Sequence, residues 1–166
     1  HIRAAVVRTH LRNRWQKWVL PKGLLLKSLA AKRAGLPVVF VTGVFDIWHL
    51  EHQQFLQKTR DLGGILLVGV ESDARVKVMK GEGRPVFSQE RRRQRILDKK
   101  IADEVFVLPE EFSDVADYRA LLHLVQPDYL AISSHSKHQE VKRTLMAEVG
   151  GQVVVVHRHN PNISST

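Results

Sequence analysis

The chain has 166 residues, of which 43% are apolar, and this is enough for one domain with a sizeable core. The composition excludes general disorder, and the absence of cysteine excludes disulfides, thiolate zinc sites and cysteine nucleophiles. The formal net charge of +9 suggests nucleic-acid binding, but residues 1–36 carry nine basic and no acidic side chains, whereas residues 37–166 carry 17 of each. The excess charge therefore belongs to an N-terminal extension, and we do not expect nucleic acid as a partner.

We predict that residues 1–36 form a basic helical extension, with helices over about 3–19 and 23–34 separated by Pro21 and Gly23. Apolar residues at helical spacing mark one face of the first helix: Leu11, Trp15, Trp18 and Val19. Such a face packs on the domain itself or contacts an acidic partner or an anionic membrane surface, and a targeting presequence would have the same composition. The partner of the extension stays open.

The chain contains no apolar run near the roughly 18 residues that a membrane-spanning helix needs. We therefore expect no transmembrane segment and a cytoplasmic protein. A homodimer is one of the oligomeric states that the sequence leaves open.

Residues 37–166 alternate short apolar runs with helical stretches, which predicts βαβ units and an α/β fold. The expected architecture is a Rossmann-like parallel sheet of about five strands flanked by helices, and it forms one domain. The strands are predicted at 38–43, 65–71, 104–108, 128–132 and 152–157, and the helices at 50–61, 88–99, 115–125 and 137–149. Right-handed crossovers bring the carboxyl ends of the strands to one edge, where ligands bind.

The first predicted strand ends at Gly43 and is followed by Asp46, His49 and His52. The glycine lets backbone N–H groups approach a ligand closely. Because the two histidines are three residues apart at the start of a helix, they share one face and could hold phosphate oxygens. The alternative is that each histidine only caps or packs the helix start, and we favour the phosphate site for the loop as a whole.

The second predicted strand leads into Glu71 and Asp73 and then into a basic segment with Lys77, Lys80, Gly81, Gly83 and Arg84. Two glycines and several cations are typical of a mobile loop that closes on a polyphosphate. A solvated basic loop is the alternative.

Three further segments offer polar groups to the ligand edge. Ser88 is a plausible N-cap for a helix that carries four arginines, of which only one or two can face the site. His135 and His138 could form a metal pair, but no third ligand is identifiable, so we favour contact with a second substrate. The hydroxyls of Ser164, Ser165 and Thr166 could bind a phosphate or form a frayed polar tail.

The ordered set of segments from about residue 24 to 166 resembles the cytidylyltransferase-like nucleotidyltransferases, which share a His-x-Gly-His signature. Within that family it is most similar to the adenylyltransferase of bacterial ADP-heptose synthesis, followed by the glycerol-phosphate cytidylyltransferases. The matching motifs are Thr42-Gly-Val-Phe-Asp-Ile-Trp-His49, Lys80-Gly81 with Arg84-Pro-Val86, Glu90 with Arg92, and Ser164-Ser-Thr166.

The resemblance implies transfer of a nucleoside monophosphate from an NTP to the phosphate of a small sugar or polyol, with release of pyrophosphate. ATP is the first choice and CTP the second, and Mg²⁺ is expected to arrive with the NTP. The implied catalytic residues are His49, His52 and Lys80. The implied nucleotide-binding residues are Thr42, Gly43, Val44, Phe45, Arg92, Ser164, Ser165 and Thr166. The implied substrate-binding residues are Asp46, which could instead orient the loop, and Glu71, Asp73, Ser133 and His135. No metal ligand is assigned.

Glu51 stands between the two histidines, where the family has glycine. We expect its bulk and negative charge to oppose a bound triphosphate by about 1 kcal/mol or more. A changed acceptor or a loss of the usual activity would follow, so the alternative function is a degenerate nucleotide-binding or regulatory module on the same fold.

Overall fold

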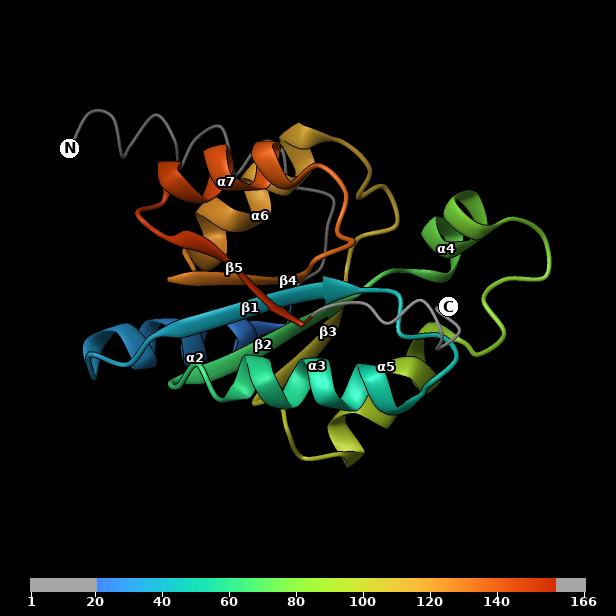
Figure 1. The fold of residues 1–166 in the computed structure, drawn as a ribbon, viewed down its shortest axis with the longest axis horizontal. Coiled ribbons are helices and arrows are strands. Elements are labelled where there is room, and N and C mark those ends of the chain that lie inside the picture. The colour runs from blue at the N-terminus through green and yellow to red at the C-terminus, as the bar shows by residue number, and fades with distance from the viewer. Residues whose placement is uncertain (1–20, 158–166) are drawn as a thin grey trace.

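The computed structural model describes residues 21–157, which form a five-stranded, all-parallel sheet with helices on both faces (Figure 1). The strands are β1 (Val38–Gly43), β2 (Ile65–Val70), β3 (Glu104–Val107), β4 (Tyr129–Ser133) and β5 (Gln152–His157). The helices are α2 (Lys22–Arg33), α3 (Leu50–Arg60), α4 (Asp73–Lys80), α5 (Gln89–Asp98), α6 (Val115–Val125) and α7 (Gln139–Glu148). The sheet order is β3-β2-β1-β4-β5. This confirms the predicted Rossmann-like α/β class.

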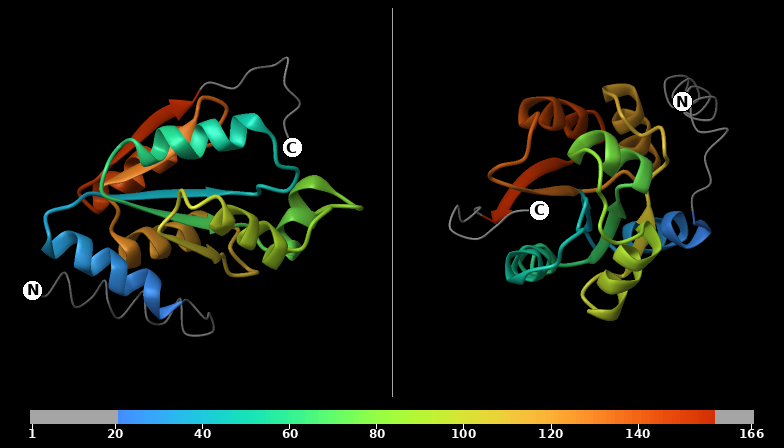
Figure 2. Two further views of the ribbon diagram at one scale, coloured as in Figure 1. Left: turned by 90° about the horizontal axis from the view of Figure 1, so that it is seen from below. Right: turned by 90° about the vertical axis from the view of Figure 1, so that its right-hand side faces the viewer.

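Both faces of the sheet are buried, which explains why the strands read as near-continuous apolar runs. On one face, Phe40, Leu67 and Phe106 pack against α2, α6 and α7. On the other face, Val41 and Val68 pack against α3 and α5. Figure 2 shows the twisted sheet between these two layers of helices.

The ligand edge lies where the strand order reverses. The chain moves outward from β1 through β2 to β3 and then crosses to β4 on the other side of β1. The carboxyl ends of β1 and β4 therefore diverge into connections on opposite faces, and a crevice opens between them. Thr42 and Gly43 at the end of β1, with Ser133 at the end of β4, form part of its wall.

The main departure from the predicted elements is helix α4, which occupies the first half of the segment predicted as a mobile basic loop. Its Ser72 N-cap accepts a hydrogen bond from the Arg75 N–H, and Gly81 ends it with a φ of 95°. Lys77 and Lys80 thus lie on a helix and not on a flexible loop. Among its residues only Val76 is buried, so the helix has no apolar stripe from which periodicity could predict it.

Helix α2 is the described part of the predicted N-terminal extension, and it packs directly on the sheet domain. Leu24 is fully buried in the core, and Ser28 donates a hydrogen bond to the Val125 carbonyl at 2.8 Å. Lys27 donates to the Asp103 carbonyl and forms an ion pair with Glu104 at 2.9 Å. The helix predicted at 3–19, with its apolar face, lies outside the described residues. Within residues 21–157, no helix is long and apolar enough to cross a membrane.

Candidate active site

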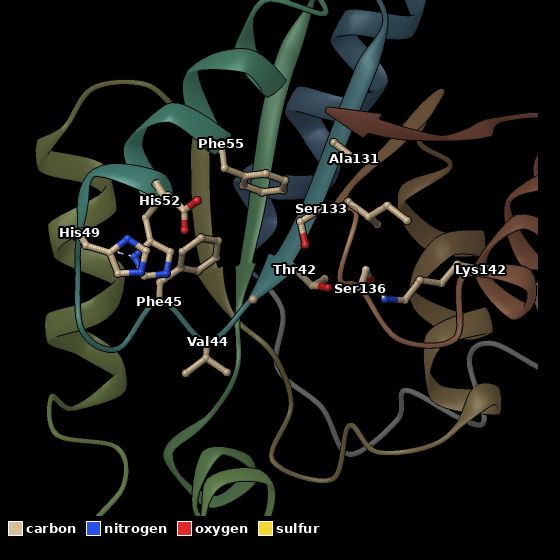
Figure 3. Close-up of a pocket in the computed structure, with 13 residues that line it drawn as sticks. Thr42, Val44, Phe45, His49, His52, Phe55, Ala131, Ser133, Ser136 and Lys142 are labelled. Atoms are coloured by element: carbon tan, nitrogen blue, oxygen red, sulfur yellow. Dashed lines mark hydrogen bonds between the residues drawn. The ribbon is translucent and has the colours of Figure 1, made fainter. Parts of the chain in front are cut away.

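A cavity of about 280 Å³ lies at the crevice between β1 and β4. The β1–α3 segment supplies one wall with Thr42, Gly43, Val44, Phe45, His49, Glu51, His52 and Phe55, and the β4–α7 segment supplies the other with Ala131, Ile132, Ser133, Ser136 and Lys142. Figure 3 shows His49 and His52 on one side, Lys142 on the other, and Thr42 between them. The sequence-predicted residues from Thr42 to Phe45, both histidines and Ser133 are thus brought together.

The two histidine rings stack with their centroids 4.1 Å apart at the start of α3. The His49 N–H donates to Nδ1 of His52 at 3.3 Å, so in the neutral ring the proton lies on Nε2. Burial and the neighbouring His49 lower the pKa of His52 to about 4, although Glu51 acts in the opposite direction. His52 is therefore a neutral hydrogen-bonding group at pH 7.

Both ring nitrogens of His49 are buried and have no hydrogen-bond partner among the described residues. Buried polar atoms are nearly always paired in folded proteins, and the exceptions mark strained or ligand-binding positions. Because His49 lines the cavity, a ring N–H of this residue can donate a hydrogen bond to an oxygen atom of a ligand placed there.

Asp46 fixes the shape of the β1–α3 loop through hydrogen bonds to the segment that precedes α5. Its side chain is fully buried, and its two carboxylate oxygens accept hydrogen bonds from the Arg84 side chain and from the backbone N–H groups of Val86 and Phe87 at 2.8 to 2.9 Å. Burial acts to raise the pKa of Asp46, but these hydrogen bonds outweigh it and lower the pKa. Arg84, which was predicted to face a polyphosphate, is thus held by Asp46. For Asp46, the geometry favours the loop-orienting role over substrate contact.

Arg92 ties the same loop to the end of β2. Its guanidinium is fully buried and donates to the carbonyls of Phe87, Val44 and Glu71 and to the Asp73 carboxylate. Four of its five N–H groups are occupied by the protein itself. The prediction that Arg92 holds the outer phosphates of an NTP is untested, and in this structure its contacts position the cavity walls.

A second cavity, of about 400 Å³, adjoins the first and shares Thr42 and Lys142 with it. Its other lining residues come from the first turns of α4, α6 and α7 and from the segments just before these helices, and they include Glu71, Arg75, Ser113, Asp114, Tyr118 and His138. Glu71, a predicted substrate contact, lies in this second cavity and not in the first.

The other predicted site residues lie outside both cavity walls. Lys80 ends α4, where burial and the nearby charges of Arg84 and Lys137 lower its pKa. Asp73 is half-exposed and pairs with Arg92. His135 is exposed on the β4–α7 connection. Ser164, Ser165 and Thr166 lie outside the described residues.

Comparison with known proteins identifies the family to which this chain belongs. Residues 40–166 match the family described as cytidylyltransferase-like. The chain belongs to the cytidylyltransferase-like family. It is thereby a domain of the nucleotidyltransferase type, as the sequence motifs predicted.

Two bifunctional HldE proteins are similar in sequence to most of this chain. The chain is 38% identical over 109 residues to the bifunctional protein HldE of a Nitratiruptor species, and the match covers 66% of this chain and 22% of HldE. With HldE of Helicobacter pylori it shares 33% identity over 138 residues, covering 80% and 28%. The chain thus spans about a quarter of the length of these curated relatives.

Solved structures support the same fold. The lipopolysaccharide core biosynthesis protein from Thermoplasma volcanium superimposes with a TM-score of 0.61 at 27% identity, covering 76% of this chain and 98% of that protein. The pantoate-beta-alanine ligase of Francisella tularensis, at 12% identity and a TM-score of 0.59, covers 83% of this chain and 66% of its own and shares the fold alone.

Glu51 is a carboxylate in a nearly buried position. Glu51 is only 6% exposed and lies in the wall of the first cavity, in the first turn of α3. Its carboxylate is close enough to His52 to influence the pKa of that ring. The predicted conflict between Glu51 and a bound triphosphate would therefore arise inside the first cavity.

Sequence reasoning missed Tyr118, Ser136 and Lys142. Tyr118 is partly buried against the core, its hydroxyl lies 3.3 Å from the Thr42 hydroxyl, and burial raises its pKa to about 12. Lys142 lies one turn into α7, whose start follows directly from the end of β4. Its position near the amino end of a helix that begins at the ligand edge was the only available signal.

Proposed function

We propose that this chain is a nucleotidyltransferase that moves a nucleoside monophosphate from an NTP, with ATP first and CTP second, to the phosphate of a small sugar or polyol. The observation that carries this proposal is the pair of buried, unpaired ring nitrogens of His49 in the wall of a cavity at the β1–β4 crevice. The resemblance to the adenylyltransferase of ADP-heptose synthesis is the reason for preferring ATP.

In the proposed reaction, an acceptor phosphate oxygen attacks the α-phosphorus of the NTP in line. The bond between the α-phosphorus and its bridging oxygen breaks, and pyrophosphate leaves with the electron pair. No covalent enzyme intermediate is needed, so the residues act by positioning and by stabilising charge.

In this mechanism, His49 and His52 would donate hydrogen bonds to oxygens around the α-phosphorus. His52 is suited to this because it is neutral at pH 7, and its Nδ1 is engaged by the His49 N–H. Backbone N–H groups near Gly43 could approach the phosphates closely, because glycine has no side chain. A Cβ at this position would lie 2.7 Å from the Phe45 ring, so a larger residue would require that ring to shift.

Magnesium would arrive bound to the triphosphate. Among residues 21–157, no cluster of three or more carboxylates and histidines is arranged to hold a metal ion. When bound, the ion would neutralise part of the phosphate charge.

The test is pyrophosphate release from ATP, CTP, GTP or UTP with a panel of sugar 1-phosphates and glycerol 3-phosphate. We expect release that requires both substrates and is fastest with ATP. Nucleotide binding without product from any pair would instead support the non-catalytic module. Failure to bind any NTP would refute both functions.

A further inference from the structure

The second cavity contains a cluster of charged and polar groups that the nucleotide site does not use. It adjoins the first cavity through Thr42 and Lys142, and it is also lined by Glu71, directly after β2, and by Arg75, in the first turn of α4. We propose that Lys142 binds the acceptor's phosphate at the boundary between the two cavities, and that Glu71 and Arg75 bind the acceptor's hydroxyl groups in the second cavity. This inference rests on the proposed function and assigns its acceptor site.

Lys142 has the position that such a role requires. Its ammonium group donates to the Ser136 hydroxyl at 2.7 Å and lies 5.9 Å from the centre of the Tyr118 ring, so it is held on two sides. Figure 3 shows its side chain directed toward Ser136 and Thr42. Only one of its three N–H groups is used by the Ser136 contact, and an ammonium is a suitable ligand for a phosphate.

The position of Thr42 explains why the reacting phosphate should lie at this boundary. Thr42 is the second-last residue of β1, lines both cavities and hydrogen-bonds to the Tyr118 hydroxyl. An acceptor phosphate held beside Thr42 and Lys142 would face the first cavity, where the α-phosphorus is proposed to lie. Its oxygen could then attack in line while pyrophosphate departs toward the opposite side.

Glu71 and Arg75 carry buried polar atoms that lack partners. The Glu71 Oε2 and the Arg75 Nε have no hydrogen-bond partner among the described residues. An unpaired buried acceptor and an unpaired buried donor in one cavity are complementary to a hydroxyl, which can both donate and accept. Burial also raises the pKa of Glu71 to about 7, against the charges of Arg75, Arg92 and Lys142, so near neutral pH it is partly protonated.

The size and polarity of the cavity suit a small hydroxylated ligand. Its volume of about 400 Å³ falls in the usual range of small-molecule sites, roughly 300 to 1,000 Å³. Apolar side chains of Phe112, Val115, Val141 and Leu145 line the remainder and would pack against the carbon skeleton.

The experiment measures equilibrium binding of three probes by ³¹P NMR, without NTP: glucose 1-phosphate, glycerol 3-phosphate and inorganic phosphate. Lys142→Met is compared with Arg143→Met, which removes a neighbouring, exposed charge on the same helix. We expect Lys142→Met to weaken binding of all three probes about tenfold, since a charged hydrogen bond to phosphate is lost. Arg143→Met should change binding less than about twofold, as is usual for an exposed charge pair.

A second pair of variants separates phosphate from hydroxyl recognition. Glu71→Gln and Arg75→Met should weaken glucose 1-phosphate about fivefold or more but leave inorganic phosphate unchanged, because only the ester carries the sugar hydroxyls that these residues are proposed to bind. The Kd of ATP should stay within about threefold in Glu71→Gln, Arg75→Met and Arg143→Met, whose side chains lie outside the wall of the first cavity. Equal effects of Lys142→Met and Arg143→Met, a loss confined to ATP, or no binding of any probe to the wild-type protein would overturn the inference.

These results are distinguishable from failure of the proposed function. If the wild-type chain binds the esters through Lys142 but releases no pyrophosphate with any NTP, the proposed reaction fails and the assigned acceptor site stands. If it releases pyrophosphate and the acceptor KM is unaffected in Lys142→Met and Glu71→Gln, the reaction stands and the assigned site is wrong.

Discussion

The two cavities at the carboxyl edge of the sheet are built in different ways. The first is formed mainly by one continuous segment, from Thr42 to Phe55, and its two histidine rings stack with their centroids 4.1 Å apart. The second is assembled from the ends of four separate elements and contains charged groups, of which Glu71 and Lys142 influence each other. The difference teaches that one site depends on the shape of a loop, whereas the other depends on how helices α6 and α7 pack.

The largest expected effect comes from releasing the loop of the first cavity. Asp46→Asn replaces one acceptor oxygen with an N–H₂ group among three donors, so we expect the free energy of unfolding to fall by about 3 to 5 kcal/mol. Urea unfolding measures this change. Asp98→Asn is the matched control, because Asp98 is exposed and, among residues 21–157, accepts a side-chain hydrogen bond from Gln94 alone, at 2.9 Å. Equal midpoints for both variants would show that Asp46 does not hold the loop.

Removing a ring that faces the first cavity should act on the reaction more than on folding. His49→Asn is expected to lower kcat about 100- to 1,000-fold, which corresponds to loss of one preorganised donor in a transition state. His123→Asn, on α6 beside Glu148, provides the control, since that histidine contacts neither cavity. An unchanged kcat in His49→Asn would contradict the role assigned to the unpaired nitrogens.

The two cavities should give opposite pH dependences of stability. The pKa of Glu71 is raised from 4.5 to about 7, so between these values the folded state holds a proton that the unfolded chain releases, and stability falls as pH rises. The pKa of His52 is lowered from 6.5 to about 4, so over that interval the folded state binds fewer protons and stability rises with pH.

Chemical unfolding at pH 4.5 and pH 8 tests this contrast. In the wild type, Glu71 should lower the free energy of unfolding by up to about 3 kcal/mol from pH 4.5 to pH 8, and Glu71→Gln should abolish this decrease. Over the same interval His52 should raise the free energy of unfolding by a similar amount, and His52→Asn should abolish this increase. Parallel pH profiles for the wild type and both variants would show that neither group titrates as the structure implies.

The smallest effect concerns Glu51 in the wall of the first cavity. Glu51→Gly should raise affinity for NTP about fivefold, by removing charge and bulk worth roughly 1 kcal/mol. Glu51→Gln keeps the bulk and removes the charge, so the two variants together separate the two causes. If Glu51→Gly raises neither affinity nor turnover, the steric and electrostatic account of this residue is wrong.

The contrast between a cavity built from one continuous segment and a cavity built from separate elements also explains what could be predicted from the sequence. Strand and helix periodicity placed all five strands within about one residue, and the first cavity followed because its residues are contiguous after Gly43. Helix α4 was missed because it buries only Val76, although Ser72 and Gly81 mark its ends. Tyr118 and Lys142 could not be found, because only the sheet order brings α6 and α7 beside the end of β1.

The sequence also could not predict which N–H groups of the arginines form hydrogen bonds within the protein itself. Arg92 and Arg84 were both predicted to meet phosphates, and the sequence did not show that backbone carbonyls and Asp46 also accept hydrogen bonds from them; the phosphate contacts stay predictions. A basic residue in a motif does not reveal whether its partner is a ligand or the neighbouring loop.

The most direct test of the central claim is a crystal structure with an ATP analogue that carries a methylene group between its α- and β-phosphorus atoms, together with the best acceptor from the panel. The account predicts the α-phosphate in the first cavity beside His49 and Thr42, and the acceptor phosphate at Lys142 with its hydroxyls in the second cavity. A triphosphate lying in the second cavity, or an acceptor bound away from Thr42 and Lys142, would contradict it.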